Sequence, residues 1–141
     1  MDDKKTTYLQ MIQGTIDRMS TTSAIFKGFC ATIVAGIMAV SYSEINKWVF
    51  VLAVSPVACF LLLDIYYLLL ERRFRALYNR VRLGEHEVNF DLTPPKVGSL
   101  RESERCSIWN CIKSPSIYLF YGPLMAILVA IIIMKFKELT I

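Results

Sequence analysis

The sequence is poor in the residues from which catalytic and metal sites are usually built. Its 141 residues include one histidine, His86, which stands between two glutamates and has no obvious nucleophile partner. The chain carries no Gly-rich phosphate loop, no Gly-x-Ser-x-Gly elbow and no paired metal-ligand motif. We therefore expect a protein that is not an enzyme and that uses neither a cofactor nor a metal.

Cysteine is also scarce. Two of the four cysteines, Cys30 and Cys59, fall inside apolar stretches, and the other two, Cys106 and Cys111, form a C-x4-C pair. Such a pair, with one histidine in the whole chain, is a weak zinc signature. The sequence favours ordinary buried or interfacial cysteines over a metal centre.

The N-terminus lacks the apolar core of a signal peptide, because its first twenty residues are mostly polar. We expect the first apolar stretch to be retained as an anchor. The range 1–20 is predicted as an amphipathic cytoplasmic or interfacial helix, because apolar residues recur in it at helical spacing. These residues are Tyr8, Ile12, Ile16 and Met19. The helix either lies flat on the inner membrane face or, as the favoured alternative, packs against another cytoplasmic helix.

Apolar residues are abundant: they make up 55% of the chain and give a mean hydropathy of +0.44. Three apolar runs, 21–42, 48–70 and 117–136, are long enough to cross a hydrocarbon core of about 30 Å at about 1.5 Å per residue. The predicted fold is an all-α membrane protein with three transmembrane helices and a small helical cytoplasmic cap. Three spans offer little surface for packing within one chain, which favours an oligomer.

The second run is not expected to stop at the membrane surface, since no helix breaker occurs before Gly84. We predict a transmembrane helix over 48–83 that continues into the cytosol, with Pro56 kinking it. Residues 84–114 are predicted as a cytoplasmic loop and a short helix, and residues 115–136 as the third transmembrane helix.

The basic residues predict the orientation. Most of them follow the second run: Arg72, Arg73, Arg75, Arg80, Arg82, Lys96, Arg101, Arg105 and Lys113. Because basic flanks stay in the cytoplasm, this connection is placed there, together with Lys4, Lys5 and Arg18 of the N-terminus. Lys135 and Lys137 then face outward, a conflict that the larger asymmetry outweighs. We predict a multi-pass membrane protein with a cytoplasmic N-terminus.

Each of the first two spans carries one charged residue, Lys27 in the first and Asp64 in the second. Counted from the cytoplasmic ends of antiparallel helices, both lie roughly 9–11 Å below the membrane boundary. Equal depth allows a salt bridge that would lock the bundle or sit at a gate. The alternative is that Lys27 extends to the headgroups while Asp64 caps a local polar group.

Small side chains line one side of the first span. We name this face the small-residue seam, and it contains Ala24, Gly28, Ala31, Ala35 and Ala39, with Thr32 and Gly36 adjoining. Small residues let helix backbones approach closely in lipid, where hydrophobic exclusion is absent. Packing within the chain is the favoured use, and a seam between protomers or a narrow pore lining is the alternative.

Several segments together resemble a known group of proteins. They are YLQMIQGTIDRM, SAIFKGF, LLLDIYYLLLERRFRALYNRVR and the loop NFDLTPP. These segments look like those of small bacterial three-span membrane proteins that are encoded beside nucleotide-synthesising enzymes in anti-phage defence operons. The chain is most similar to the membrane effectors of Hailong-type systems, and it also resembles the transmembrane effectors of cyclic-nucleotide defence systems.

The resemblance implies a homo-oligomeric ion channel, a tetramer, in the bacterial inner membrane. Its state would be set by a nucleotide made by the partner enzyme, and opening would depolarise the membrane. In the Hailong case the implied ligand is a short oligodeoxyadenylate that keeps the channel closed.

An oligomer would gather several copies of the arginines that follow the second span. Guanidinium groups bind phosphates through forked hydrogen bonds, and an aromatic ring stacks on a base. The predicted ligand-binding residues are Arg72, Arg75, Arg80 and Arg82 for phosphates, with Phe74 and Tyr78 for a base. The alternative is that these arginines bind no ligand, and that they set the orientation of the chain in the membrane and contact lipid phosphates.

Two other functions remain open. The chain is alternatively a non-conducting membrane adaptor whose basic cytoplasmic face docks a partner. A proton-coupled transporter that uses Asp64 is disfavoured by the odd number of spans and the absence of an internal repeat.

Overall fold

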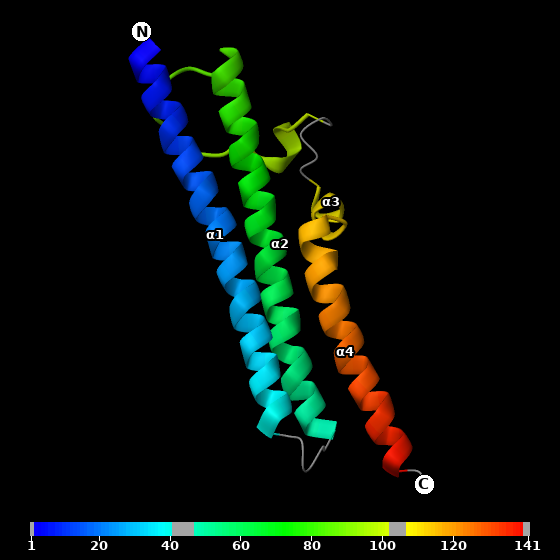
Figure 1. Ribbon diagram of the computed structural model, residues 1–141. Helices are drawn as coiled ribbons and strands as arrows, with labels where there is room; N and C mark the ends of the chain where they lie inside the picture. Colours follow the sequence, from blue (N-terminus) through cyan, green and yellow to red (C-terminus); the bar gives the residue numbers. More distant parts are fainter. Residues whose placement is uncertain (1, 41–46, 102–106, 140–141) are drawn as a thin grey trace. The chain divides into compact units, whose positions relative to one another are not determined.

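The computed structural model describes residues 2–40, 47–101 and 107–139. Over these residues the chain is helical and contains no strand (Figure 1). The elements, in chain order, are α1 (Asp2–Val40), α2 (Lys47–Leu83), the short 3-10 helix η1 (Val97–Ser99), α3 (Ile108–Ile112) and α4 (Pro115–Leu139). The predicted all-α class is therefore confirmed. Residues 41 and 42 of the first predicted span, and Arg105 and Cys106 of the predicted loop, lie outside the described residues.

The predicted N-terminal helix and the first predicted span are one element. Helix α1 is continuous over 39 residues, although a polar Ser-Thr-Thr-Ser stretch lies in its middle. Thr22 donates a hydrogen bond to the carbonyl of Arg18, 2.8 Å away, so its hydroxyl is satisfied within the helix. Helix α2 likewise runs through Pro56 without ending, and it stops at Leu83 as the sequence predicts.

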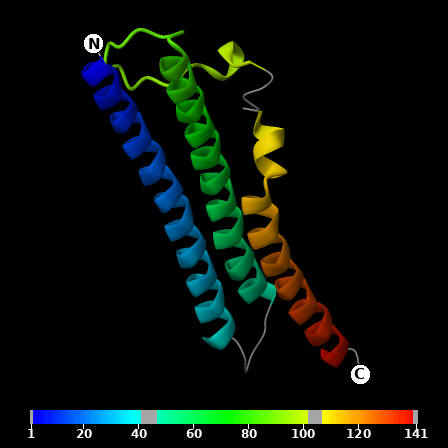
Figure 2. The same ribbon diagram turned by 45° about the horizontal axis from the view of Figure 1, so that its top comes forward.

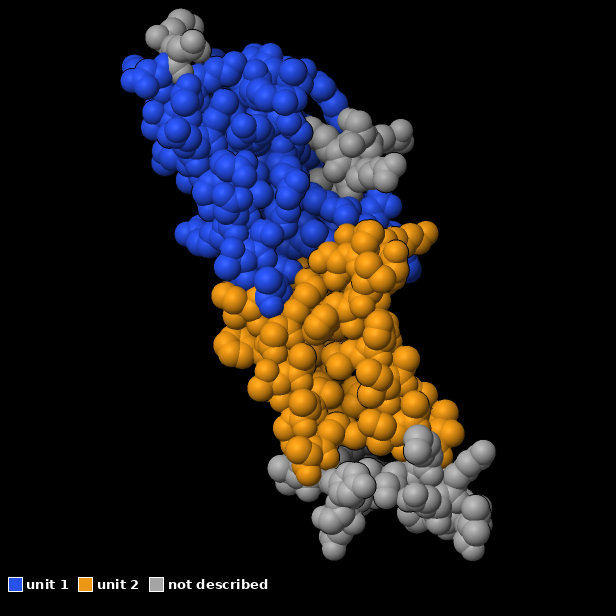
Figure 3. Space-filling model, in the orientation of Figure 1, with its two compact units in different colours: residues 1–24, 65–112 blue, residues 25–64, 113–141 orange. Residues whose placement is uncertain are grey.

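The described chain divides into two compact units (Figure 3). Unit 1 comprises residues 1–24 and 65–112, and unit 2 comprises residues 25–64 and 113–141. Helices α1 and α2 contribute residues to both units, because the units divide after residue 24, within α1, and after residue 64, within α2. Each unit has a packing core of its own, and the two are described separately below.

In unit 1, α1 and α2 lie side by side (Figures 1 and 2). The core of the unit is made by Tyr8, Ile12, Ile16, Phe74, Leu77 and Val81, each at most 6% exposed. The apolar stripe of α1 is thus buried against α2. Of the two alternatives for this stripe, packing against another helix is confirmed, and a stripe lying flat on the membrane is wrong because these side chains are already covered.

Helix α2 ends in a C-terminal capping motif that contains a glycine, Gly84. Gly84 has a φ of +77°, in the left-handed region that glycine adopts without steric cost. The N–H of Gly84 donates to the carbonyl of Val81 and that of Glu85 to the carbonyl of Arg80. This is the Schellman pattern, and it satisfies two carbonyls that a helix end leaves without partners.

The loop after α2 folds back onto the two helices of unit 1. The Tyr8 hydroxyl donates to the carbonyl of Asp91, and the Tyr8 ring packs on Phe90 at a centroid distance of 5.6 Å. Phe90 has a φ of +59°, an uncommon conformation for a residue with a side chain. Asp91 accepts hydrogen bonds from the N–H and the hydroxyl of Thr93, which stabilises this bend locally.

Unit 2 is built from the apolar parts of α1 and α2 together with α4. Its buried side chains include Cys30, Val34, Ala53, Val57, Ile117, Tyr121 and Leu128. Large apolar side chains also cover its outside, and Phe29, Leu62 and Leu119 are 57%, 69% and 64% exposed. An apolar exterior of this kind marks a surface that faces lipid or another protein rather than water.

Two helices have the length and composition of membrane spans, Asp3–Ala39 and Leu52–Leu83. The apolar part of α4 within the residues searched, Pro115–Ile131, is shorter. The described chain therefore supports two candidate spans, and the third predicted span corresponds to this shorter apolar helix. These properties suggest membrane association by length and composition.

Candidate functional site

Asp64 is the one charged residue that is fully buried in the described part of the chain. Helix α2 places it among apolar residues of unit 2, where a carboxylate loses its hydration. Burying an isolated carboxylate is very costly, so such groups are paired or neutralised. The polar groups that surround Asp64 in unit 2 are therefore the first place to look for a functional site.

Lys27 of α1 supplies the opposite charge. Its Nζ atom lies 2.6 Å from Oδ2 of Asp64, and the two side chains are 16% and 1% exposed. The ammonium group also donates a hydrogen bond to Oγ of Ser116, at 3.2 Å. The two residues that the sequence places at equal depth thus form an ion pair, and Ser116 joins α4 to it.

A second residue of α4, Tyr121, completes the cluster. Its side chain is 4% exposed, and it interacts electrostatically with Asp64 and Cys30. Its hydroxyl lies near the carboxylate without meeting hydrogen-bond geometry to any atom of the described residues. A buried hydroxyl without a partner costs about 1–3 kcal/mol, so its persistence at this position calls for an explanation.

Ser116 and Tyr121 were not predicted as site residues, although the sequence carries a signal for Tyr121. Tyr121 lies six residues into α4, the same count that places Lys27 within the first span. Tyr121 therefore lies at the same depth as Lys27 and Asp64, and equal depth predicts that it lies close to both. We name Lys27, Asp64, Ser116 and Tyr121 the buried polar cluster.

A second candidate site lies in unit 1. An open pocket of about 240 Å³ is lined by Gln13, Ile16, Arg75, Tyr78 and Asn79. Of the six predicted ligand-binding residues, Arg75 and Tyr78 line it. Its volume is below the roughly 300–1,000 Å³ typical of small-molecule sites, so one chain can hold a phosphate or part of a base there.

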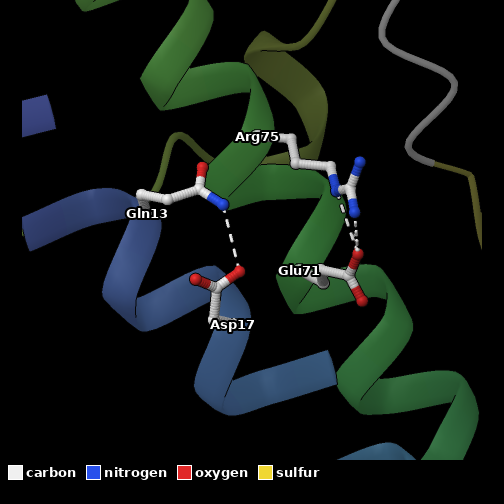
Figure 4. Close-up of polar contacts among 4 residues, drawn as sticks. All are labelled: Gln13, Asp17, Glu71 and Arg75. Carbon is white, nitrogen blue, oxygen red and sulfur yellow. Dashed lines mark hydrogen bonds and ion pairs between the residues drawn. The ribbon is translucent and has the colours of Figure 1, made fainter. Parts of the chain in front are cut away.

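The guanidinium group beside this pocket already has a partner (Figure 4). Nε and Nη2 of Arg75 lie 2.9 Å and 2.7 Å from the same oxygen of Glu71. On α1, Gln13 donates through Nε2 to the carboxylate of Asp17 at 3.0 Å. Because the Arg75 side chain is 61% exposed, its ion pair is weak, and a phosphate can compete with Glu71 for it.

The other predicted ligand residues lie outside this pocket. Phe74 is 6% exposed within the core of unit 1, so the prediction that its ring stacks on a base is not supported by this structure. Arg80 donates to the carbonyl of Ser99 at 2.8 Å. Arg72 is near Cys111, and Arg82 is exposed at the end of α2. A single chain therefore does not gather the four arginines in one place.

Arg73, which was not among the predicted site residues, has a structural role. Its Nε and Nη2 donate to the carbonyls of Pro95 and Pro94, at 2.8 Å and 3.2 Å. Lys5 acts similarly from α1 by donating to the carbonyl of Arg82 at 3.0 Å. Of the basic residues that the topology rule explains, Arg73 thus also holds the loop of unit 1, and Lys5 joins α1 to the end of α2.

The small-residue seam does not pack within unit 2. Gly28, Thr32, Ala35 and Gly36 are all exposed, whereas Cys30 and Val34 on another side of α1 are buried. The favoured prediction, packing of the seam within the chain, is therefore wrong. The buried face of this part of α1 is instead the one that carries Cys30 and Val34, and the largest apolar side chains, Ile25, Phe29 and Ile33, are exposed as the seam is.

The cysteines do not form a metal centre in the described residues, where no three metal-ligating side chains come together. Cys111 is buried in unit 1, and burial raises the pKa of its thiol, with the charge of Arg72 opposing that rise. Burial also raises the pKa of the Tyr8 phenol, and the charge of Asp91 adds to the effect. Both groups stay protonated at neutral pH.

No protein-family model, no curated protein and no solved structure matches this chain.

Proposed function

We propose that this chain is an inner-membrane ion-channel effector of bacterial anti-phage defence. It acts as a homo-oligomer, depolarises the membrane when open, and is gated by a nucleotide or oligonucleotide signal from a partner enzyme. The observation that carries the proposal is the buried ion pair between Lys27 and Asp64. The resemblance to Hailong-type effectors supplies the biological setting.

The apolar exterior of unit 2 supports its placement in the bilayer. In this arrangement the apolar parts of α1, α2 and α4 cross the membrane, and the N-terminus lies in the cytoplasm according to the distribution of basic residues. Unit 1, with its exposed arginines, lies in the cytoplasm. Oligomerisation is proposed because the small-residue seam remains uncovered on a single chain.

The ion pair is the part of the chain best suited to gating. Ionisable residues in membrane segments are expensive and commonly mark ion pathways, and removing one partner of a buried pair costs about 3–5 kcal/mol. The pair joins α1 to α2, and Ser116 extends it to α4. A state in which Lys27 leaves Asp64 would therefore change the contacts of all three helices.

The ligand is proposed to act on unit 1. Arg75 and Tyr78 offer a guanidinium group and an aromatic ring at an open pocket, and an oligomer would supply further copies of them. A phosphate of a short oligodeoxyadenylate would replace Glu71 at Arg75. In the proposed scheme the ligand holds the channel closed, and its loss opens it.

The second candidate, a non-conducting membrane adaptor, is favoured by the side chains that hold the loop of unit 1. Arg73 and Arg80 are bound to carbonyls and thereby order a surface on which a partner could dock. In an adaptor the ion pair would serve only the stability of unit 2. Substitutions of the pair would then change the amount of protein and leave the membrane potential unchanged.

The testing experiment measures membrane potential with a voltage-sensitive dye in cells that express the full chain from an inducible promoter. We expect rapid depolarisation, without uptake of large dyes, when the partner enzyme is absent, and less depolarisation when it is present. The matched variants are Lys27→Asp, Asp64→Lys and the double swap, which restores an opposite pair. An unchanged potential under phage infection with the complete operon, at confirmed membrane levels of the protein, would favour the adaptor.

A further inference from the structure

The buried polar cluster surrounds the Lys27 ammonium group with oxygen atoms from other helices. Asp64 provides a carboxylate oxygen at 2.6 Å and Ser116 a hydroxyl oxygen at 3.2 Å. We infer that this cluster is a binding site for a monovalent cation, and that Lys27 occupies it as a tethered cation. When Lys27 leaves, a potassium or sodium ion takes its place.

The chemistry of the site fits such an exchange. A lysine ammonium group is a compact point charge that is strongly hydrated in water, as an alkali cation is. Both are stabilised by carboxylate and hydroxyl oxygens. Replacing one by the other leaves the charge of the cluster unchanged, with one negative group and one positive group, so Asp64 remains compensated at each stage of the exchange.

Tyr121 provides the second observation. Its hydroxyl is buried beside Asp64 and does not meet hydrogen-bond geometry to any atom of the described residues. A phenolic oxygen has acceptor lone pairs, which Lys27 does not use. A free cation is not restrained by a side-chain stem, so it can move to a position between Asp64 and Tyr121. In the cation-bound state the buried phenolic oxygen, which meets no hydrogen-bond geometry without the ion, gains a direct contact with it.

The number of carboxylates indicates a monovalent ion. Asp64 is the one carboxylate in the cluster, and the described residues contain no group of three metal-ligating side chains. Calcium takes six to eight oxygen ligands, often from several carboxylates, and magnesium demands near-ideal octahedral geometry and retains several waters. A single carboxylate with two hydroxyls offers too few ligands and too little charge for either ion.

The cation site adds a detail to the proposed function. Only its location on the path of the conducted ions rests on that proposal. If unit 2 conducts, the closed state has Lys27 in the site and the open state has mobile cations there, so the channel is selective for cations. Binding itself can be measured without conduction. Failure of the cation site and failure of the channel are therefore separate results.

The test uses the full chain in lipid nanodiscs and compares Lys27→Ala with Lys27→Met. Alanine leaves room for an ion beside Asp64, whereas methionine fills the space with an uncharged chain. Thermal unfolding is followed in potassium chloride, sodium chloride and the chloride of the large cation N-methylglucamine. We expect the Tm of Lys27→Ala to be about 5 °C or more higher in a small cation than in the large one. Lys27→Met and the wild type should show no such difference.

Two further variants exclude a general salt effect. Lys27→Ala combined with Asp64→Asn removes both charges and should lose the dependence on small cations. Lys27→Ala combined with Tyr121→Phe should reduce it, because one oxygen is missing. An equal Tm of Lys27→Ala in all three salts would overturn the inference, since Asp64 would then be neutralised by a proton. Failure of Lys27→Ala to fold in every salt would also overturn it, because a bound cation should restore the fold.

Conduction is measured separately on the wild type. Cation binding by Lys27→Ala without any current from reconstituted wild-type protein would support the cation site and contradict the proposed channel. Current from the wild type without cation binding by Lys27→Ala would support the channel and remove this site from its mechanism.

Discussion

Units 1 and 2 use charge in opposite ways, although α1 and α2 contribute to both. In unit 1 the charged side chains lie around an apolar core and contact loop carbonyls or exposed partners. In unit 2 the outside is apolar and the charge lies within, as the pair of Lys27 and Asp64. A charge near water is screened and its loss costs little, whereas a buried charge makes the fold depend on its partner.

The comparison also separates two kinds of helix packing. In unit 1 the buried face of α1 carries Tyr8, Ile12 and Ile16, and its opposite face is polar, as expected in water. In unit 2 the buried face of the same helix carries Cys30 and Val34, and its other faces are also apolar. Periodicity of apolar residues therefore identifies the packing face in unit 1, but it cannot do so in unit 2.

The largest effect is expected from Asp64→Asn, which leaves the Lys27 ammonium group without its carboxylate. We expect a loss of about 3–5 kcal/mol in the free energy of unfolding, concentrated in unit 2. Hydrogen exchange measured segment by segment should show faster exchange in the parts of α1, α2 and α4 within unit 2. The combined Lys27→Met and Asp64→Leu variant serves as the control, because it removes both charges together. Normal abundance with unchanged exchange and activity in Asp64→Asn would contradict a coupled pair.

The corresponding change in unit 1 removes apolar volume instead of charge. Leu77 is 1% exposed in the core of unit 1, so Leu77→Ala should reduce the free energy of unfolding by about 2–5 kcal/mol. Leu83→Ala is the matched control, since Leu83 is 62% exposed. Chemical denaturation of the reconstituted protein measures both variants. Equal effects of the two substitutions would show that the core of unit 1 is not formed as described.

A smaller effect separates two neighbouring arginines of α2. Arg73→Ala removes two charged hydrogen bonds to the carbonyls of Pro94 and Pro95, and should cost about 1.5–3 kcal/mol. Arg75→Ala removes an exposed pair with Glu71 and should cost about 0.5 kcal/mol or less. Limited proteolysis should cleave the loop after Gly84 much faster in Arg73→Ala only. Conversely, phosphate or oligodeoxyadenylate binding should be weakened by Arg75→Ala.

The smallest effect concerns the Cys111 thiol. Its pKa is raised above the usual value of 9.0 by burial, so less of it is thiolate at neutral pH than in an unfolded chain. In a variant that keeps Cys111 as its one cysteine, alkylation at pH 7.5 should be at least about tenfold slower than in denaturant. Arg72→Ala should slow it further, because Arg72 opposes the rise in pKa. A rate equal to that of the unfolded chain would show that this thiol is not buried.

The same pKa shift predicts how unit 1 responds to alkali. The thiol of Cys111 and the phenol of Tyr8 both have raised pKa values in the folded chain. Above the usual values of 9.0 and 10.0, the unfolded chain has released protons that the folded chain still holds, so stability falls as the pH rises. Well below pH 9 both groups are protonated in either state, so their titration should add no pH dependence to the free energy of unfolding, measured by chemical denaturation across this pH range.

Local features of the sequence predict the elements well. Residues 48–83 were expected as a helix, and α2 covers Lys47–Leu83 because no breaker occurs before Gly84. The stripe of Tyr8, Ile12 and Ile16 predicts which face of the helix is buried, because the rest of this segment is mostly polar. The pairing of Lys27 with Asp64 could be anticipated because a buried charge needs a partner and few are available at that depth.

What the sequence could not predict depends on contacts between distant segments. Arg73 differs from Arg75 only in the face of α2 that it occupies, yet it binds the loop carbonyls. The left-handed conformation of Phe90 accompanies the contact of its ring with Tyr8, which lies more than eighty positions away in the sequence. The small-residue seam was assigned to the wrong surface because composition alone does not show which face of an apolar helix meets its neighbours.

The contacts of Arg73 and Arg80 with backbone carbonyls affect which substitutions the loop of unit 1 can accept. Every amino acid has a carbonyl oxygen, so the residues at positions 94, 95 and 99 can be exchanged without removing the acceptor itself. The two arginines have no such freedom, because no other side chain offers a guanidinium group at that reach. Related sequences should therefore vary at positions 94, 95 and 99 while keeping both arginines, and such changes would leave these hydrogen bonds in place.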